Sequence, residues 1–141
     1  MATSTQLLGP IFALATWTAL ILLLVAYRRF RAGSAGLVHP REFALGESPK
    51  VPAAVALANR NYMNLLELPV LFYVVCLIAI VFGVTSPAVS VLAWLYVALR
   101  IVHSIVQVTY NRVIHRFTAF AASNGVLIAL WVLVGLGSLV R

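Results

Sequence analysis

The segment Pro52–Phe82, PAAVALANRNYMNLLELPVLFYVVCLIAIVF, is long and apolar but contains two charged residues. A helix that spans a membrane needs about 20 mostly apolar residues, and this segment exceeds that length. A charge inside such a helix costs at least ~2.5–3.5 kcal/mol on insertion scales, so Arg60 and Glu67 mark a candidate functional site. Pro69 follows Glu67 by two residues and predicts a kink beside these charges.

Three more segments have the length and composition of membrane spans. We expect the four spans at about residues 7–27, 52–82, 87–111 and 117–139. Because 63% of the residues are hydrophobic, a soluble domain is excluded. We predict an all-α membrane protein in which residues 1–141 form one domain, a bundle of four transmembrane helices with up-down-up-down topology.

The basic residues predict the orientation in the membrane. Seven of the ten lie in the loop before the second span and in the turn before the fourth: Arg28, Arg29, Arg31, Arg41, Lys50, Arg112 and Arg116. The positive-inside rule places these residues on the cytoplasmic side, so both termini should face away from the cytoplasm. Ala- and Val-rich spans with short loops favour a bacterial inner membrane over endoplasmic reticulum. The basic residues separate apolar segments and have few aromatic neighbours, which argues against nucleic-acid binding.

Polar residues form one stripe on the second span and another on the third. Their helical spacings, i, i+4, i+7 and i, i+3, i+7, place each stripe on a single face of its helix. Arg60 and His103 each lie eight residues, or about 12 Å at 1.5 Å per residue, from the predicted cytoplasmic ends of their spans, so the two stripes can meet at one level. The two stripes are Arg60, Asn64 and Glu67, and Arg100, His103 and Gln107.

The chemistry of these stripes predicts a polar ligand with carboxylates and an amine. Arginine binds carboxylates through two parallel hydrogen bonds, and the amides of Asn64 and Gln107 offer both donors and acceptors. Glu67 could neutralise Arg60 or Arg100, or could bind a ligand ammonium. The same polar residues could instead hold helices together, an alternative that spacing leaves open. The His and acidic residues form no metal-ligand motif, so no metal is predicted.

The string Arg60–Pro69, RNYMNLLELP, resembles the second-helix signature of the MAPEG family, the membrane-associated proteins of eicosanoid and glutathione metabolism. Arg100 and His103, followed by Arg112 and Arg116, are similar to the third-helix signature of that family. The resemblance, which is to microsomal glutathione S-transferase-like members, covers essentially the whole chain. It implies a left-handed four-helix bundle, a homotrimer in contact with membrane lipid, and glutathione bound between subunits near the cytoplasmic side.

The resemblance also implies roles for individual residues. Arg116 would hold glutathione and stabilise its thiolate, and Arg29 at the end of the first span is a further match. Because a nearby arginine lowers the pKa of a thiol and the thiolate is the nucleophile, the resemblance implies a transferase or peroxidase that acts on a hydrophobic small molecule from the bilayer. The implied glutathione-binding cluster is Arg60, Asn64, Glu67, Arg100, His103 and Gln107.

Three positions depart from the pattern of the family enzymes. Gln107 and Phe120 stand where many members carry tyrosine, and Phe117 stands where prostaglandin-forming members carry serine. A prostaglandin synthase is therefore not expected, and Tyr110 is displaced by about one helical turn from Gln107. An alternative is a non-catalytic, lipid-binding or scaffold member of the family. A small proton-coupled transporter using Glu67 is disfavoured, because the flanking arginines would repel a cationic substrate.

Overall fold

The computed structural model of the protein describes residues 4–44 and 46–140, and within these ranges the regular elements are helices. Four spans are long and apolar enough to cross a membrane, with α2 and α3 together forming the second, so the protein is an integral multi-pass membrane protein. This confirms the predicted all-α, four-span arrangement. The elements are η1 (Ser4–Leu7), α1 (Leu8–Ser34), η2 (Pro40–Phe43), α2 (Ala53–Leu66), α3 (Pro69–Val81), α4 (Pro87–Val108) and α5 (Val113–Leu139).

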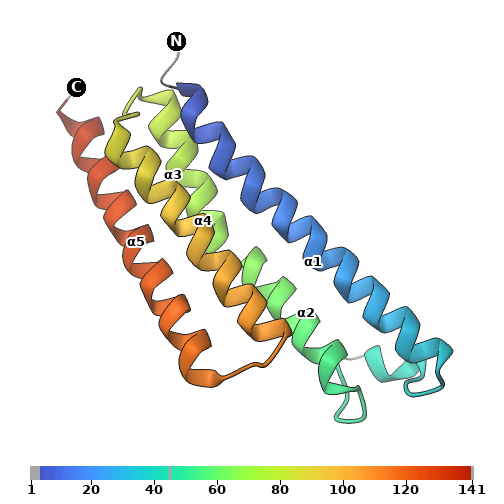
Figure 1. Cartoon of the computed structure of the whole chain (residues 1–141). Coiled ribbons are helices and arrows are strands. Elements are labelled where there is room, and N and C mark those ends of the chain that lie inside the picture. The colour runs from blue at the N-terminus through green and yellow to red at the C-terminus, as the bar shows by residue number, and fades with distance from the viewer. Residues whose placement is uncertain (1–3, 45, 141) are drawn as a thin grey trace.

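Successive spans run in opposite directions, as Figure 1 shows. The described ends of the chain lie at one end of the bundle together with the α3–α4 turn. The α1–α2 loop and the α4–α5 turn lie at the opposite end, which we call the basic end because it carries Arg41, Lys50 and Arg112. Helix α4 packs against α1, α2 and α5, so it is the central element of the bundle.

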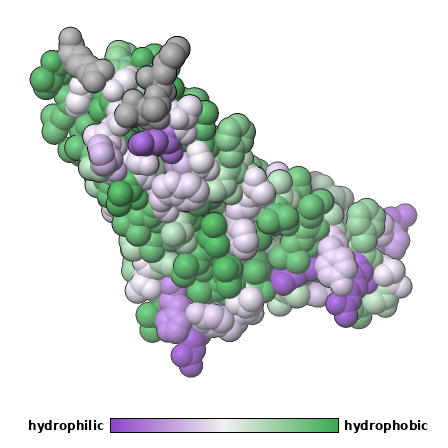
Figure 2. Space-filling view, turned by 45° about the horizontal axis from the view of Figure 1, so that its top comes forward, coloured by the Kyte–Doolittle hydropathy of each residue, from purple (hydrophilic) through white to green (hydrophobic). Residues whose placement is uncertain are grey.

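The outer surface is apolar along most of its length. Figure 2 shows hydrophobic residues over the middle of one face, with strongly hydrophilic residues gathered towards the ends. Large side chains such as Phe12 and Leu23 are each 65% exposed, an arrangement that suits acyl chains rather than water. Inside the bundle, Phe72 of α3 stacks on Tyr96 of α4 with 4.7 Å between ring centroids, and both are fully buried.

The end of α5 approaches the α3–α4 turn closely. A Cβ atom on Gly137 would lie 2.5 Å from Val84 Cγ1, whereas one on Gly135 would have no neighbour within 4 Å. Small residues allow helices in a membrane to approach one another in this way. The turn itself contains Gly83 with a positive φ of 67°, a conformation that glycine adopts without a Cβ penalty.

Three helix boundaries differ from those predicted. Helix α1 continues to Ser34 rather than ending near Tyr27, because its hydrogen-bonding extends through the basic residues that follow the apolar run. Basic side chains near a helix C-terminus also complement the helix dipole. Helix α4 ends at Val108, before Asn111, which has a left-handed φ of 46°. Helix α5 begins at Val113, ahead of the apolar run that set the predicted start.

The kink predicted at Pro69 is a complete break between α2 and α3. Helix α2 ends at Leu66 and α3 begins at Pro69. Proline has no backbone N–H, so the Leu65 carbonyl loses its usual donor four residues later. Beyond the break, α3 packs against α5, whereas α2 packs against α1 and α4. The two halves of the second span therefore have different neighbours, and a cavity lies between α2, α4 and α5 at the level where α2 ends.

Candidate functional site

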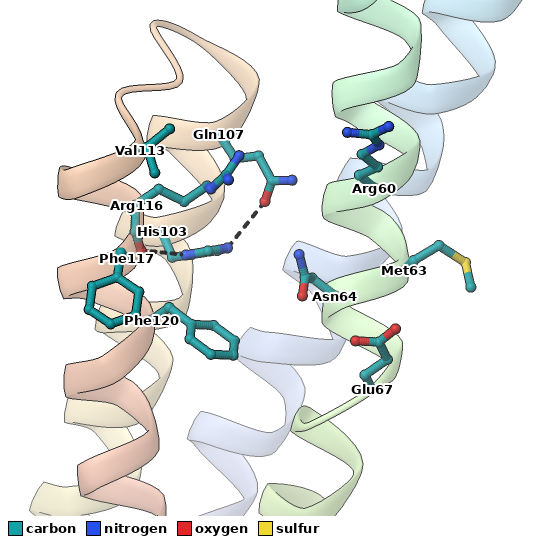
Figure 3. A pocket seen from close by; sticks show the side chains of 10 residues that line it. All are labelled: Arg60, Met63, Asn64, Glu67, His103, Gln107, Val113, Arg116, Phe117 and Phe120. Atoms are coloured by element: carbon teal, nitrogen blue, oxygen red, sulfur yellow. Dashed lines mark hydrogen bonds between the residues drawn. The ribbon is translucent and has the colours of Figure 1, made fainter. Parts of the chain in front are cut away.

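The cavity between α2, α4 and α5 has a volume of about 490 Å³ and lies in the half of the bundle nearest the basic end. This volume is within the range of small-molecule binding sites. Figure 3 shows that the side chains of Arg60 and Asn64 project from α2 towards α4 and α5. The lining residues are Arg60, Met63, Asn64 and Glu67 from α2, His103 and Gln107 from α4, and Val113, Arg116, Phe117 and Phe120 from α5.

The structure brings most of the sequence-predicted site residues together. Residues of both polar stripes line the same cavity, because α2, the half of the second span before Pro69, is in contact with α4. Of the predicted residues, Arg60, Asn64, Glu67, His103, Gln107 and Arg116 line the cavity. Arg100 and Arg29 do not line it, and each has a different structural setting.

Arg100 lies behind the cavity and joins α4 to the end of α2. Its side chain is fully buried, its Nη2 donates to the Asn64 carbonyl over 2.7 Å, and its Cζ lies 5.6 Å from the centroid of the Phe120 ring. The last four carbonyls of a helix lack intrahelical donors, and the C-terminus of a helix carries partial negative charge. The guanidinium group therefore caps the end of α2 that the break at Pro69 creates. Its Nε and Nη1 have no hydrogen-bond partner among the described residues.

Glu67 forms no ion pair with Arg60 or Arg100 in the part of the chain that the structure describes. In the described part of the chain the ion pair found is Arg29 with Glu47, at 3.7 Å between Nη2 and Oε1. Glu67 and Arg60 are both exposed at the cavity rather than paired with each other. The first of the two roles expected for Glu67 is thus not found, and both charges can interact with a ligand.

His103 connects the floor of the cavity to α5. Its Nδ1 lies 3.0 Å from the Arg116 carbonyl oxygen, and its Nε2 lies 3.1 Å from Gln107 Oε1. A carbonyl oxygen only accepts hydrogen bonds, so the Nδ1 position carries a proton. The Gln107 amide can serve either form of Nε2, through its oxygen or through its NH₂ group. Both ring nitrogens are therefore used to hold the site together, with His103 and Gln107 buried.

Arg116 is held by its side chain as well as by its carbonyl. Its Nη1 donates to Asn111 Oδ1 over 2.7 Å. Asn111 lies in the turn between α4 and α5, where its own N–H donates to the Val106 carbonyl over 2.8 Å. Sequence reasoning did not single out Asn111. The sequence did contain a signal, because asparagine tolerates a left-handed φ and Asn111 lies between two predicted helices.

A family model described as the MAPEG family matches residues 7–136. The chain belongs to the MAPEG family. No curated protein and no solved structure gives a match. The matched range includes all the residues that line the cavity, from Arg60 to Phe120. Membership supports, in general terms, a membrane function related to glutathione, of the transferase or peroxidase type or a related one.

Two polar contacts that sequence reasoning missed fix the helices around the cavity of this MAPEG protein. Asn61, which is fully buried and does not line the cavity, donates from its Nδ2 to the Ser104 hydroxyl of α4. Arg28 of α1 donates from Nη1 to the Ala54 carbonyl over 2.7 Å and from Nη2 to the Val108 carbonyl over 3.0 Å. One guanidinium group thus connects the ends of α1, α2 and α4 at the basic end.

Arg29 contacts the α1–α2 loop in this MAPEG protein and does not line the cavity. Its Nη2 donates to Asn59 Oδ1 over 3.1 Å. Its Cζ lies 4.8 Å from the centroid of the Phe43 ring, and its Nη2 pairs with Glu47 as described above. These contacts hold the loop against α1 and the start of α2.

None of the residues that line the cavity carries a hydroxyl group. Phe117 and Phe120 occupy the wall from α5, and Gln107 lies on the floor. Tyr110 does not replace the missing hydroxyls. Its hydroxyl lies 3.1 Å from His115 Nδ1 at the exposed α4–α5 turn, outside the cavity. The positively charged groups that line the cavity and are ionised at neutral pH are the guanidinium groups of Arg60 and Arg116.

Proposed function

We propose that this MAPEG protein is an integral membrane glutathione-dependent transferase or peroxidase. It would activate glutathione as a thiolate at an interface between subunits, for attack on an apolar electrophile. The observation that carries this proposal is that Arg60 of α2, Arg116 of α5 and the carboxylate of Glu67 all line one cavity.

The groups in the cavity complement those of glutathione, which has two carboxylates, one ammonium group, two amides and a thiol. Arg60 can bind a carboxylate through its planar fork of donors. Glu67 can accept hydrogen bonds from the ammonium group, and Asn64 can both donate to and accept from an amide. Arg116 then remains to interact with the thiol group of glutathione. In this arrangement the bound carboxylate and the ammonium group each lie near a side chain of opposite charge.

Glutathione supplies the sulfur nucleophile, so no nucleophilic side chain is required. The positive charge of Arg116 favours the thiolate over the thiol. In conjugation the sulfur electron pair forms a bond to carbon, and the leaving group departs with its electrons. In peroxide reduction the sulfur attacks oxygen, the O–O bond breaks, and a second thiol completes the reduction to disulfide, alcohol and water. Met63, Val113 and Phe117 form an apolar rim that suits a substrate from the bilayer.

A homotrimer would complete the site. Arg60 and Glu67 are exposed in a single protomer at a level where neighbouring residues are apolar. Exposure of charges to lipid is costly, so a neighbouring subunit over the open side of the cavity would be favourable. Because Arg29 is engaged by its own loop, it would contact glutathione only by reaching the cavity of a neighbouring subunit. We further propose that the basic end faces the cytoplasm, that both termini face away from it, and that a bacterial inner membrane is the host.

The test is a glutathione titration of the protein in detergent, followed by ultraviolet thiolate absorbance and by calorimetry. We expect saturable binding accompanied by thiolate formation. Arg116→Ala should reduce thiolate formation by at least about tenfold, the equivalent of one pKa unit. Arg112→Ala is the matched control, because Arg112 is exposed and does not line the cavity. No binding at millimolar glutathione would refute the proposal.

The absence of hydroxyl groups from the cavity lining favours a second candidate, a non-catalytic lipid-binding or scaffold protein. In that case the guanidinium groups would bind an anionic ligand without chemistry. Glutathione binding without thiolate formation, or binding of an anionic lipid that glutathione does not displace, would favour this candidate over the enzyme.

A further inference from the structure

The α4–α5 turn contains an unusual residue next to the cavity. Asn111 has a φ of 46°, which makes it the non-glycine residue with a positive φ in the described part of the chain. Glycine adopts this conformation with less strain than asparagine does. What asparagine adds at this position is a side-chain amide, whose Oδ1 accepts from Arg116 Nη1 over 2.7 Å.

Arg116 is thereby held at two points by the C-terminal part of α4 and the turn that follows it. His103 contacts its carbonyl oxygen at 3.0 Å, and Asn111 binds its guanidinium group. The Nε and Nη2 groups of Arg116 make no hydrogen bond within the described residues. One edge of the planar group is therefore anchored, and the remaining donors can serve a ligand in the cavity that Arg116 lines.

We propose that Asn111 is a positioning residue that holds the Arg116 guanidinium group where its charge meets the sulfur of a bound thiol. This inference rests on the proposed function and extends it to a residue outside the cavity lining. A long, flexible side chain at the mouth of a cavity would otherwise sample many rotamers, and ordering it at the time of binding would cost free energy. An anchor that exists before binding removes that cost.

The anchoring can be tested without any ligand. Arginine labelled with nitrogen-15 reports the exchange of guanidinium protons by NMR. The Arg116 signal should exchange slowly in the wild type and in Asn111→Asp, which keeps an acceptor oxygen. In Asn111→Gly, which suits the positive φ but has no acceptor, exchange should accelerate by about tenfold, the order expected for one lost hydrogen bond. Equal exchange in wild type and Asn111→Gly would refute the anchor whatever the protein binds.

The effect on the thiol is tested by the pH dependence of thiolate absorbance with bound glutathione. Asn111→Gly should raise the midpoint of thiolate formation by about one pH unit, a tenfold change, with an unchanged melting temperature. In an Arg116→Ala background the same substitution should have no further effect. A shift that persists in that background would show that Asn111 does not act through Arg116. If the wild type forms no thiolate, the proposed function fails, and the NMR result alone decides whether the anchor exists.

Discussion

The close contact between α5 and the α3–α4 turn predicts opposite outcomes for one substitution at two glycines of the same helix. Gly135 and Gly137 are two residues apart in α5. Alanine at position 135 would meet no atom within 4 Å, whereas alanine at position 137 would place its Cβ 2.5 Å from Val84 Cγ1. The same chemical change is therefore harmless at one glycine and forces a displacement at the other.

The expected magnitudes follow from these distances. Carbon atoms in good contact lie ~3.5–4.0 Å apart, so the Gly137→Ala methyl group would be at least about 1 Å too close to Val84. Overpacking of this kind costs ~1–3 kcal/mol. Alanine also gains ~0.8–1 kcal/mol over glycine in a helix interior. We expect Gly135→Ala to stabilise the fold by up to that amount, and Gly137→Ala to be less stable than Gly135→Ala by ~1–3 kcal/mol.

The assay is reversible unfolding in mixed detergent micelles, with Val84→Ala added to complete a double-mutant cycle. Val84→Ala removes both methyl groups near the Gly137 position and leaves Val84 Cβ at 3.7 Å, an ordinary contact. Gly137→Ala should therefore become neutral or stabilising in that background, with a coupling energy of ~1–3 kcal/mol. Additive effects of the two substitutions would show that α5 does not approach the turn this closely, and the packing described above would be wrong.

Three further predictions concern the site and its supports. Arg28→Met should lower the unfolding free energy by about 2–4 kcal/mol, because two charge-assisted hydrogen bonds to backbone carbonyls are lost. The control Arg31→Met, at an exposed residue, should change it by less than about 0.5 kcal/mol. Equal losses of unfolding free energy in the two variants would show that Arg28 does not connect α1, α2 and α4. Phe120→Tyr should increase thiolate formation with glutathione several-fold by adding a hydroxyl to the cavity wall, measured by ultraviolet absorbance, and a decrease would argue against thiolate stabilisation there. Arg29→Ala should speed proteolysis of the loop 35–52, and it should not weaken glutathione binding to the monomeric protein in detergent micelles. Weaker glutathione binding with an unchanged rate of loop proteolysis would place Arg29 at the ligand instead.

The four spans and their polar faces could be predicted because each depends on local pattern alone. Length and apolar composition define a span, and the helical repeat places Arg60, Asn64 and Glu67 on one face. The end of α1 could not be placed in the same way. Apolar composition stops near Tyr27, but the backbone hydrogen bonds that define the helix continue to Ser34. Hydropathy therefore locates the membrane-crossing part of a helix better than its end.

The residues that line the cavity could be predicted more completely than the contacts that each of them makes. Arg100 belongs to a polar stripe, yet its side chain binds the Asn64 carbonyl in the last turn of α2, and spacing does not show where that turn ends relative to α4. Asn111 was missed for a related reason, because its importance comes from a backbone conformation and a contact across the turn. For Glu67 the sequence left two roles open, pairing with an arginine or binding a ligand ammonium group, because spacing alone gives no distance between helices.

The break in the second span has a consequence for motion. A continuous helix transmits a tilt at one end to the other, but the missing backbone hydrogen bond at Pro69 separates α2 mechanically from α3. Helix α3 packs against α5, whereas α2 packs against α1 and α4, so any change in the angle between the two halves of the span would be taken up at Glu67 and Leu68. The cavity can widen or narrow by a swing of α2 while the far half of the bundle, with its stacked aromatic rings, keeps its packing. The hydrogen bond from Arg100 to the Asn64 carbonyl in the last turn of α2 would restrain such a movement of α2 relative to α4.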